Sequence, residues 1–201
     1  MKIVGITGPT GAGKSLLSEY LRENGIPVID ADRLYHSLLV PPSPCLDALK
    51  SAFGDGVFLK NGELDRKKLA DIVFSDEKKL DLLNRTVLDF VLDRSRDILA
   101  EYRAKGYAVA AIDAPTLIES GFHLECDTVV SVICDPDTRI QRIIERDGIS
   151  SDAAKSRVSG QKSNEFYTEK SHLVIVNDKS EEEFFERCRE LKDALLKGVE
   201  P

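Results

Sequence analysis

A glycine-rich segment from Gly8 to Ser15 reads Gly-Pro-Thr-Gly-Ala-Gly-Lys-Ser and contains every fixed position of a P-loop. Its glycines permit backbone torsions and a close approach that a Cβ would obstruct, so successive N–H groups can form an anion-binding nest. Lys14 is expected to reach the terminal phosphates of a nucleoside triphosphate, and the Ser15 hydroxyl to bind Mg²⁺. The residues expected to contact the nucleotide here are Gly8, Gly11, Ala12, Gly13, Lys14, Ser15 and Leu16.

The segments on either side of this loop have the patterns that a P-loop needs. Residues 2–7 form a short apolar run typical of a buried strand, and residues 16–22 have apolar side chains at helical spacing. The loop would therefore open a helix, whose N-terminus adds positive potential to the phosphate site. The chain is therefore predicted to bind a nucleoside triphosphate.

Acidic residues follow two further predicted strands. Asp32 comes just after a turn and brief strand at 25–30, and Asp113 ends another strand at 107–113. Ligands of a parallel α/β sheet collect at the carboxyl ends of its strands. We therefore expect Asp32 to contact the substrate and to accept the proton of an attacking hydroxyl. Asp113 is expected to contact substrate and to orient Mg²⁺ directly or through water. The alternative for Asp30 and Asp32 is N-capping of the next helix.

Three arginines, Arg139, Arg142 and Arg146, are spaced so that they share one face of a helix predicted at 136–146. Such a stripe is usually solvated. Here the segment Asp147-Gly148-Ile149 follows as a hinge into a second helix at 151–161, which is typical of a mobile lid. We expect Arg142 and Arg146 to face the phosphates. The three histidines, at 36, 123 and 172, are too dispersed to suggest a zinc site.

The order of these elements predicts an α/β fold with a doubly wound, five-stranded parallel sheet of the P-loop, nucleoside monophosphate kinase-like type. The remaining strands are expected at 127–134 and 172–176, and a last helix at 180–196. The block 33–105 is helical, with a proline-rich break at 41–44 and a turn at 60–62. It is too long for a simple crossover, so it is predicted to be an acceptor-binding insertion. One domain results, with core 1–32, 106–141 and 167–201 and lid 142–166.

The net charge and the composition of the chain limit the classes of molecule that it is expected to bind. The 201 residues carry a net charge of −7, so a nucleic acid or an anionic membrane is not an expected partner. The predicted P-loop strand occupies the first residues, which leaves no room for a signal peptide, and no run is long enough for a membrane span. Four scattered cysteines are expected to be reduced thiols of a cytoplasmic protein, which would be a monomer or a weak homo-oligomer.

The sequence resembles the dephospho-coenzyme A kinase family over nearly its whole length. The resemblance depends on the P-loop and on the order and spacing of segments that match the family's motifs. These segments are Val28 to Arg33, Phe53-Gly54, Asn61 to Arg66, Leu83-Asn84, Asp113 to Glu119, Arg142 to Asp147 and Gln161. It implies transfer of the ATP γ-phosphoryl group to the ribose 3′-hydroxyl of dephospho-coenzyme A, with Mg²⁺ as cofactor.

The resemblance also implies roles for single residues. Asp32 would be the base, and Lys14 with Arg142 would stabilise the charge on the moving phosphoryl group. Asn177 would lie near the adenine. Asp65 and Arg66, in the best-matched part of the insertion, would bind the acceptor, for which a guanidinium that pairs with phosphate is suited.

The sequence departs from the family pattern at three places. Val87-Leu88-Asp89 stands where Leu-His-Pro is usual, Gln161-Lys162-Ser163 replaces Gln-Met-Pro, and Val176 to Lys179 replaces Asp-Asn-Ser-Gly. Three alternatives remain open: a P-loop kinase of another small metabolite, a tRNA prenyltransferase, and a nucleotide switch that has lost catalysis. The tRNA prenyltransferases share the Gly-Pro-Thr-x-x-Gly-Lys-Ser loop, but they are usually longer.

Overall fold

The structure is a computed structural model that describes residues 1–197. It divides into two compact units. The first contains residues 1–29 and the chain from Leu99 onward, and the second contains residues 30–98. The division falls before Asp30, the last residue of the second strand, and within the C-terminal part of a long helix, and each unit is described by itself.

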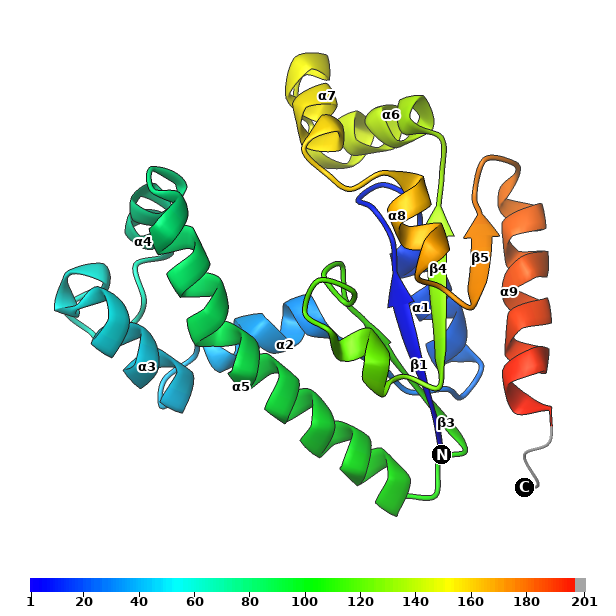
Figure 1. Cartoon of the computed structure of the whole chain (residues 1–201), viewed down its shortest axis with the longest axis horizontal. Helices are drawn as coiled ribbons and strands as arrows, with labels where there is room; N and C mark the ends of the chain where they lie inside the picture. Colours follow the sequence, from blue (N-terminus) through cyan, green and yellow to red (C-terminus); the bar gives the residue numbers. More distant parts are fainter. Residues whose placement is uncertain (198–201) are drawn as a thin grey trace. The chain divides into compact units, whose positions relative to one another are not determined.

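The first unit is built on a five-stranded parallel sheet (Figure 1). Its strands are β1 (Lys2–Thr7), β2 (Val28–Asp30), β3 (Val109–Asp113), β4 (Thr128–Ile133) and β5 (Leu173–Val176), in the order β2-β3-β1-β4-β5. Ile6 of β1 is in register with Asp113 of β3, and Thr7 is in register with Ser131 of β4. The loops after β1, β3 and β4 therefore leave the sheet at the same edge, where an α/β protein binds its ligand.

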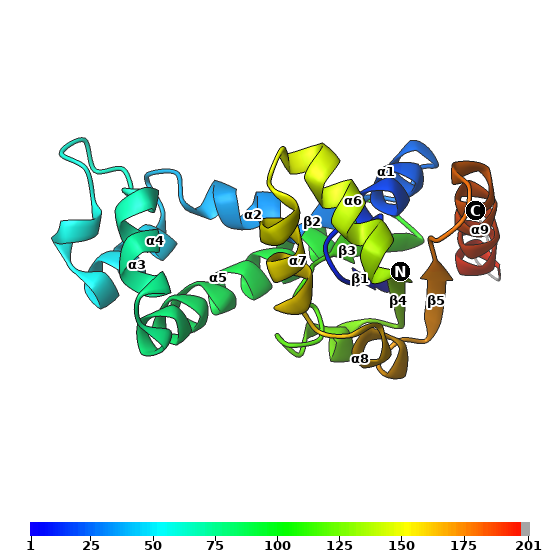
Figure 2. The same cartoon turned by 90° about the horizontal axis from the view of Figure 1, so that it is seen from above.

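Helices cover both faces of this sheet, as Figure 2 shows. Helices α1 (Lys14–Glu23) and α9 (Glu181–Leu196) pack together on one face, and the short α8 (Asn164–Glu169) contacts β4 on the other. A 3₁₀ turn, η2 (Phe122–Glu125), leads into β4. This arrangement confirms the doubly wound α/β fold.

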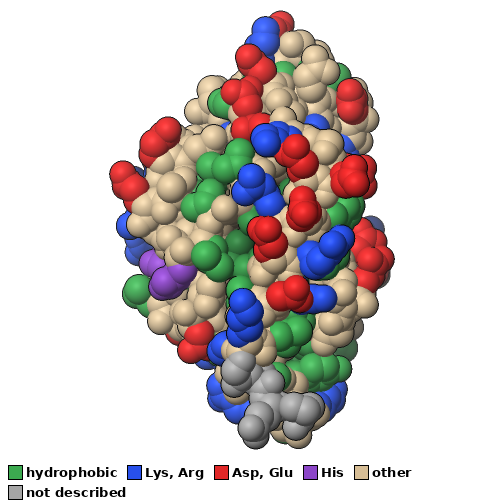
Figure 3. Space-filling view, turned by 90° about the vertical axis from the view of Figure 1, so that its right-hand side faces the viewer, with side chains coloured by type: hydrophobic (Ala, Val, Ile, Leu, Met, Phe, Trp, Pro, Cys, Tyr) green, Lys and Arg blue, Asp and Glu red, His purple; other side chains and the backbone are tan. Residues whose placement is uncertain are grey.

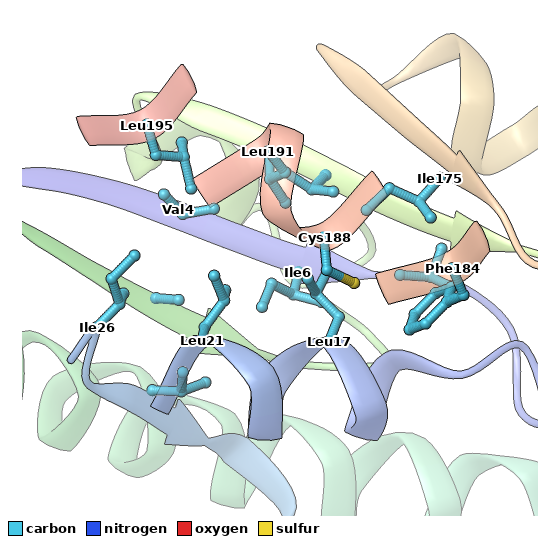
Figure 4. Close-up of a cluster of buried hydrophobic side chains, with 14 of the residues drawn as sticks. Val4, Ile6, Leu17, Leu21, Ile26, Ile175, Phe184, Cys188, Leu191 and Leu195 are labelled. Carbon is cyan, nitrogen blue, oxygen red and sulfur yellow. The ribbon is translucent and has the colours of Figure 1, made fainter. Parts of the chain in front are cut away.

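The core of the first unit lies between β1, α1 and α9 (Figure 4). Leu17 and Leu21 lie four residues apart on α1 and are fully buried, which contributes about 1.5–3 kcal/mol for each side chain. They meet side chains of β1, β5 and α9, namely Val4, Ile6, Ile175, Phe184, Cys188, Leu191 and Leu195. This packing fixes α1, so the loop that precedes α1 is held at both of its ends.

Helices α6 (Pro136–Asp147) and α7 (Ser151–Ser159) lie beyond the carboxyl end of β4 (Figure 1). The Asp135 carboxylate caps α6 by accepting hydrogen bonds from the amides of Asp137 and Thr138, and Pro136 takes the first helical position. Gly148 ends α6 with a φ of 64°. Helix α7 ends at Ser159, so the helix predicted to reach Gln161 is shorter than expected and Gln161 lies in the loop before α8.

The second unit is helical, as predicted for most of the insertion. It contains α2 (Ala31–Leu38), α3 (Pro44–Phe53), the 3₁₀ turn η1 (Asp55–Val57), α4 (Arg66–Phe74) and most of α5 (Glu77–Ala104). Helix α3 begins at the end of the proline-rich break, and an antiparallel bridge between Phe58 and Leu64 encloses the predicted turn. The unit has its own buried cluster, which includes Cys45, Leu46, Leu49, Val57, Leu69 and Val73.

The described residues were compared with the features expected of a membrane span or a strongly charged surface. In the described part of the chain no helix combines the length and apolarity that crossing a bilayer requires. On the face shown in Figure 3, acidic and basic side chains are interspersed among apolar ones.

Candidate nucleotide site

The loop between β1 and α1 has a backbone that only glycine can follow at two positions. Gly8 has a φ of 134°, and a Cβ there would lie 2.1 Å from the carbonyl oxygen of Val132. Gly13 has a φ of 107° and is the N-cap of α1, and a Cβ there would lie 2.3 Å from Nδ2 of Asn177. The loop is thus packed directly against β4 and against the segment after β5.

Gly8→Ala is expected to destabilise the protein by about 1–3 kcal/mol or more, because the new methyl group meets a fixed backbone carbonyl and the torsion is strained. A thermal melt would show this as a lower Tm. Gly25→Ala is the matched control, since Gly25 also has a positive φ but a Cβ on it would meet no atom within 4 Å. Equal losses in Tm for the two variants would show that the contact with Val132 carries no cost.

Lys14 and the N-terminus of α1 give the loop positive charge that favours an anion. The Lys14 ammonium donates to the carbonyl oxygens of Gly8 (2.7 Å) and Pro9 (3.1 Å), which draws it across the loop. The N-cap Gly13 offers no capping side chain, and the first turn of α1 holds no acidic residue. The positive end of the α1 dipole is therefore not neutralised within its own first turn.

Arg142 reaches the loop from the middle of α6. Its guanidinium donates to the carbonyl oxygens of Asn177 (3.1 Å) and Gly11 (3.4 Å) and to Sγ of Cys134 (3.3 Å). Burial, in the first place, raises the pKa of the Cys134 thiol to about 12, so this sulfur is neutral at physiological pH. In the part of the chain that the structure describes, Arg142 has no carboxylate partner.

Asn177 is buried and holds the loop from the opposite side. Its Nδ2 donates to the carbonyl oxygen of Ala12 (2.8 Å), and its backbone N–H donates to Ile133 at the end of β4. A cavity of about 240 Å³ opens beside it, lined by Gly13, Leu16, Arg142, Asn177, Lys179, Glu181 and Phe184. The structure therefore brings together the loop, Arg142 and Asn177, three features that the sequence singled out separately.

Oxygen donors suited to Mg²⁺ stand on α1 and at the end of β3. Ser15 is exposed in the first turn of α1, and the Asp113 carboxylate accepts a 2.7 Å hydrogen bond from Ser18 one turn further along that helix. A hydroxyl and a carboxylate are hard ligands of the kind that Mg²⁺ prefers, with the rest of its shell left for water and phosphate. The residues present fit this ion.

Arg146 differs from Arg142, although their spacing in the sequence suggests the same role for both. It lies at the exposed end of α6 and donates to both carboxylate oxygens of Asp147, at 2.7 Å and 3.0 Å, and Arg157 of α7 binds one of the same oxygens. The hydrogen bond from Arg146, in the first place, lowers the pKa of Asp147 to about 2. In this conformation both guanidinium groups are directed to Asp147.

Of the predicted substrate residues, Asp113 belongs to the first unit, and the other three belong to the second unit. Asp32 lies in the first turn of α2, and the neighbouring Asp30 caps that helix by accepting from the amide of Arg33 (2.9 Å). Asp65 caps α4 by accepting from the amide of Lys68 (3.0 Å). The capping alternative is thus confirmed for Asp30 but not for Asp32. Arg66 Nη1 lies 2.9 Å from Nδ1 of His36, which is four residues beyond Asp32 and so on its face of α2.

Two residues at the loop could not be identified as site residues from the sequence alone. Arg139, in the first turn of α6, is 3% exposed and donates to the carbonyl oxygen of Thr10 (2.9 Å). Gln161 bonds both the amide and the hydroxyl of Thr10. In the sequence, Gln161 stands out only as part of a family motif, and Arg139 only as one member of the arginine stripe.

Comparison with known proteins agrees with this geometry. The family model for dephospho-CoA kinase matches residues 2–183. The chain belongs to the dephospho-CoA kinase family. It is 35% identical over 194 residues to the dephospho-CoA kinase of Shouchella clausii, with 96% of this chain and 97% of the relative covered. It is 39% identical over 184 residues to that of Streptomyces avermitilis, with 92% and 89% covered. A solved structure, TT1252 from Thermus thermophilus, matches with a TM-score of 0.81 at 30% identity, covering 98% of both chains.

The departures from the dephospho-CoA kinase pattern leave the loop contacts in place. In the altered lid motif, Gln161 keeps its two hydrogen bonds to Thr10, and Ser163 is the N-cap of α8. In the altered motif after β5, Asn177 keeps its bond to Ala12. Where Leu-His-Pro is usual, Val87 packs against the buried cluster of the second unit.

Proposed function

We propose that this chain transfers the γ-phosphoryl group of ATP to the ribose 3′-hydroxyl of dephospho-CoA and releases CoA and ADP. The observation that carries the proposal is the glycine-specific P-loop, with Lys14 and Arg142 directed onto it, in a chain that the dephospho-CoA kinase family model covers almost completely. The oxygen of the acceptor hydroxyl forms a bond to the γ-phosphorus, the bond from that phosphorus to ADP breaks, and the hydroxyl proton passes to a base.

ATP binding is assigned to the first unit. The amides of the loop from Gly8 to Leu16 hold the phosphates, and Lys14 exchanges its two carbonyl partners for phosphate oxygens. Among the described residues Arg142 has carbonyl and thiol partners only, so its charge is available to the transferred group. The cavity beside Asn177 receives the base of the nucleotide, and Arg146 joins the phosphates once it leaves Asp147.

Mg²⁺ would be held by Ser15 and, directly or through water, by Asp113. The chemistry that the ion would supply there is positive charge, which would offset part of the negative charge that develops on the phosphates. Ser18 fixes the orientation of the Asp113 carboxylate through its 2.7 Å hydrogen bond.

Acceptor binding is assigned to the second unit. Asp32 accepts the proton of the attacking hydroxyl, and Arg66 binds an acceptor phosphate oxygen. Asp65 supports Arg66, because its carboxylate caps the helix that Arg66 begins.

The proposal includes a cytoplasmic site of action and a monomer or weak homo-oligomer that needs no nucleic-acid or membrane partner. It is supported by four cysteines that are all buried and free, as in reducing compartments, and by the net negative charge.

The test is ADP release measured with a panel of acceptors. The panel contains dephospho-CoA, AMP, shikimate, a tRNA mixture and a sample with no acceptor. We expect rapid ADP release with dephospho-CoA only, and mass spectrometry should find CoA in that sample. Release with another acceptor and none with dephospho-CoA would replace the proposed substrate, and equal release in all samples would indicate an ATPase.

Arg66→Ala is expected to raise the KM for dephospho-CoA about ten- to a hundredfold, because a charged hydrogen bond to phosphate is lost. The KM for ATP should change little, since ATP binding is assigned to the other unit. Initial rates with each substrate varied in turn measure both constants. Arg85→Ala is the matched control, as Arg85 is an exposed arginine of the same unit that pairs only with Asp81 in the structure. If Arg66→Ala behaves like Arg85→Ala, Arg66 has no part in acceptor binding.

A further inference from the structure

Arg139 is a buried cation that has no anionic partner among the residues that the structure describes. Its side chain extends from the first turn of α6, and the residue is 3% exposed. Its partners are the carbonyl oxygen of Thr10, 2.9 Å from Nε, and Oε1 of Gln161. No carboxylate of the described chain pairs with it. Burial lowers the pKa of Arg139 but leaves a guanidinium charged at physiological pH. A buried charge is costly unless it is paired, so this arginine requires an explanation.

Gln161 connects Arg139 to the P-loop. Its Oε1 accepts a hydrogen bond from the amide of Thr10 (3.1 Å) and another from Nη2 of Arg139. Its Nε2 donates to Oγ1 of Thr10 (2.8 Å). The amide end of Gln161 thus binds Thr10 at its backbone and its side chain, and the same oxygen holds the guanidinium.

The backbone of Arg139 also contacts the loop. A Cβ on Gly11 would lie 3.1 Å from the carbonyl oxygen of Arg139 and 3.3 Å from its Cα. Thr10 and Gly11 are therefore fitted between the first turn of α6 and Gln161. Because Gln161 lies two residues beyond the end of α7, a displacement of that segment would act directly on Thr10.

We propose that Arg139 and Gln161 are positioning residues that hold the P-loop through Thr10, so that ATP affinity depends on the segment that follows α7. The proposal rests on the assignment of this loop to ATP in the proposed function. The charge of Arg139 adds to the positive potential of the nest, and the bound triphosphate supplies the anion that this guanidinium lacks. Gln161 keeps the Thr10 peptide in the orientation that the nest requires before ATP arrives.

The experiment compares Gln161→Met with Gln141→Met. Methionine is similar to glutamine in length but forms no comparable hydrogen bonds, and Gln141 is an exposed glutamine on α6. ATP binding is measured by calorimetry without acceptor, and KM and kcat are measured with dephospho-CoA. We expect Gln161→Met to weaken ATP binding about tenfold and raise the KM for ATP to match. The KM for dephospho-CoA and kcat should stay within about twofold, because the loop is misplaced only before ATP is bound.

A double-mutant cycle separates coupling from a general loss of structure. Thr10→Val removes only the bond to Nε2 of Gln161 and should weaken ATP binding about threefold. Combined with Gln161→Met it should cause no further loss, since that bond is already absent. Arg139→Met should weaken ATP binding more than Thr10→Val, because a charge is lost as well. If Gln161→Met does not fold, as judged by its Tm, Thr10→Val alone still tests the contact.

Three outcomes would overturn the proposal. The first is an ATP dissociation constant of Gln161→Met within about twofold of that of Gln141→Met. The second is a double variant whose fold-loss in ATP affinity equals the product of the fold-losses of the two single variants. The third is an unchanged ATP dissociation constant in Thr10→Val. Because calorimetry needs no acceptor, a wild-type protein that binds ATP and ignores dephospho-CoA would refute the proposed function and leave this test intact.

Discussion

Lys14→Ala is expected to lower kcat/KM for ATP by at least about a hundredfold while the fold is preserved. The ammonium of Lys14 is drawn over the loop by the carbonyl oxygens of Gly8 and Pro9, from which it can move to the β- and γ-phosphates. It is the one cationic side chain within the glycine-rich loop sequence. The ammonium is expected to interact more strongly with the phosphates in the transition state than in the ground state, because negative charge shifts during transfer. Its loss should therefore lower kcat as well as ATP affinity.

The measurement is the rate of ADP formation at saturating dephospho-CoA with ATP varied. Lys155→Ala is the matched control, because Lys155 is an exposed lysine on α7 and the same substitution there should leave the rate unchanged. Circular dichroism and Tm should be close to wild type for both variants. A Lys14→Ala protein with unchanged kcat/KM would remove the nucleotide assignment of the loop.

The parts of the site that could be predicted from sequence are those fixed by local rules. The P-loop could be predicted because its glycines are required by backbone geometry, as Gly8 shows by its contact with the Val132 carbonyl. The sheet could be predicted because each strand is a short apolar run and the connections are long enough for parallel crossovers. The edge strand β5 fitted the same pattern, although Leu173 and Val176 remain about 40% exposed.

The different surroundings of Arg139 and Arg146 could not be predicted, because their spacing shows that they share a helix face but does not show what each position along the helix contacts. Arg139 and Arg146 are seven residues apart, which is about 10 Å along the axis of α6. Arg139, at the beginning of the helix, is therefore buried against Thr10, whereas Arg146, at the end, lies beside Asp147. Which of these surroundings each residue would meet depends on contacts across the fold, and these do not appear in a local pattern.

Helix ends set a similar limit. The periodicity of α7 does not show that the helix stops at Ser159, so the position of Gln161 in a loop, facing Thr10, was not predicted. Helix α8 was not predicted either, because six residues give too short a pattern to read. By contrast, the two capping possibilities at Asp30 and Asp32 were both visible, and the hydrogen bond to Arg33 assigns the cap to Asp30.

Asp32→Asn is expected to slow phosphoryl transfer by about a hundredfold or more, with little change in the KM for ATP. Asparagine keeps the shape of the side chain but cannot accept the proton of the acceptor hydroxyl. The cap of α2 is supplied by Asp30, so the variant should retain the helix and its Tm.

Asp30→Asn is the control for this experiment, since asparagine caps a helix as well as aspartate does and the charge change is the same. Its kcat should stay within about twofold of wild type. Single-turnover rates with ATP and dephospho-CoA would separate the chemical step from product release. A loss of ATP affinity with unchanged transfer would instead assign Asp32 to the Mg²⁺ site, and equal rates for both variants would leave the acceptor hydroxyl without a base on α2.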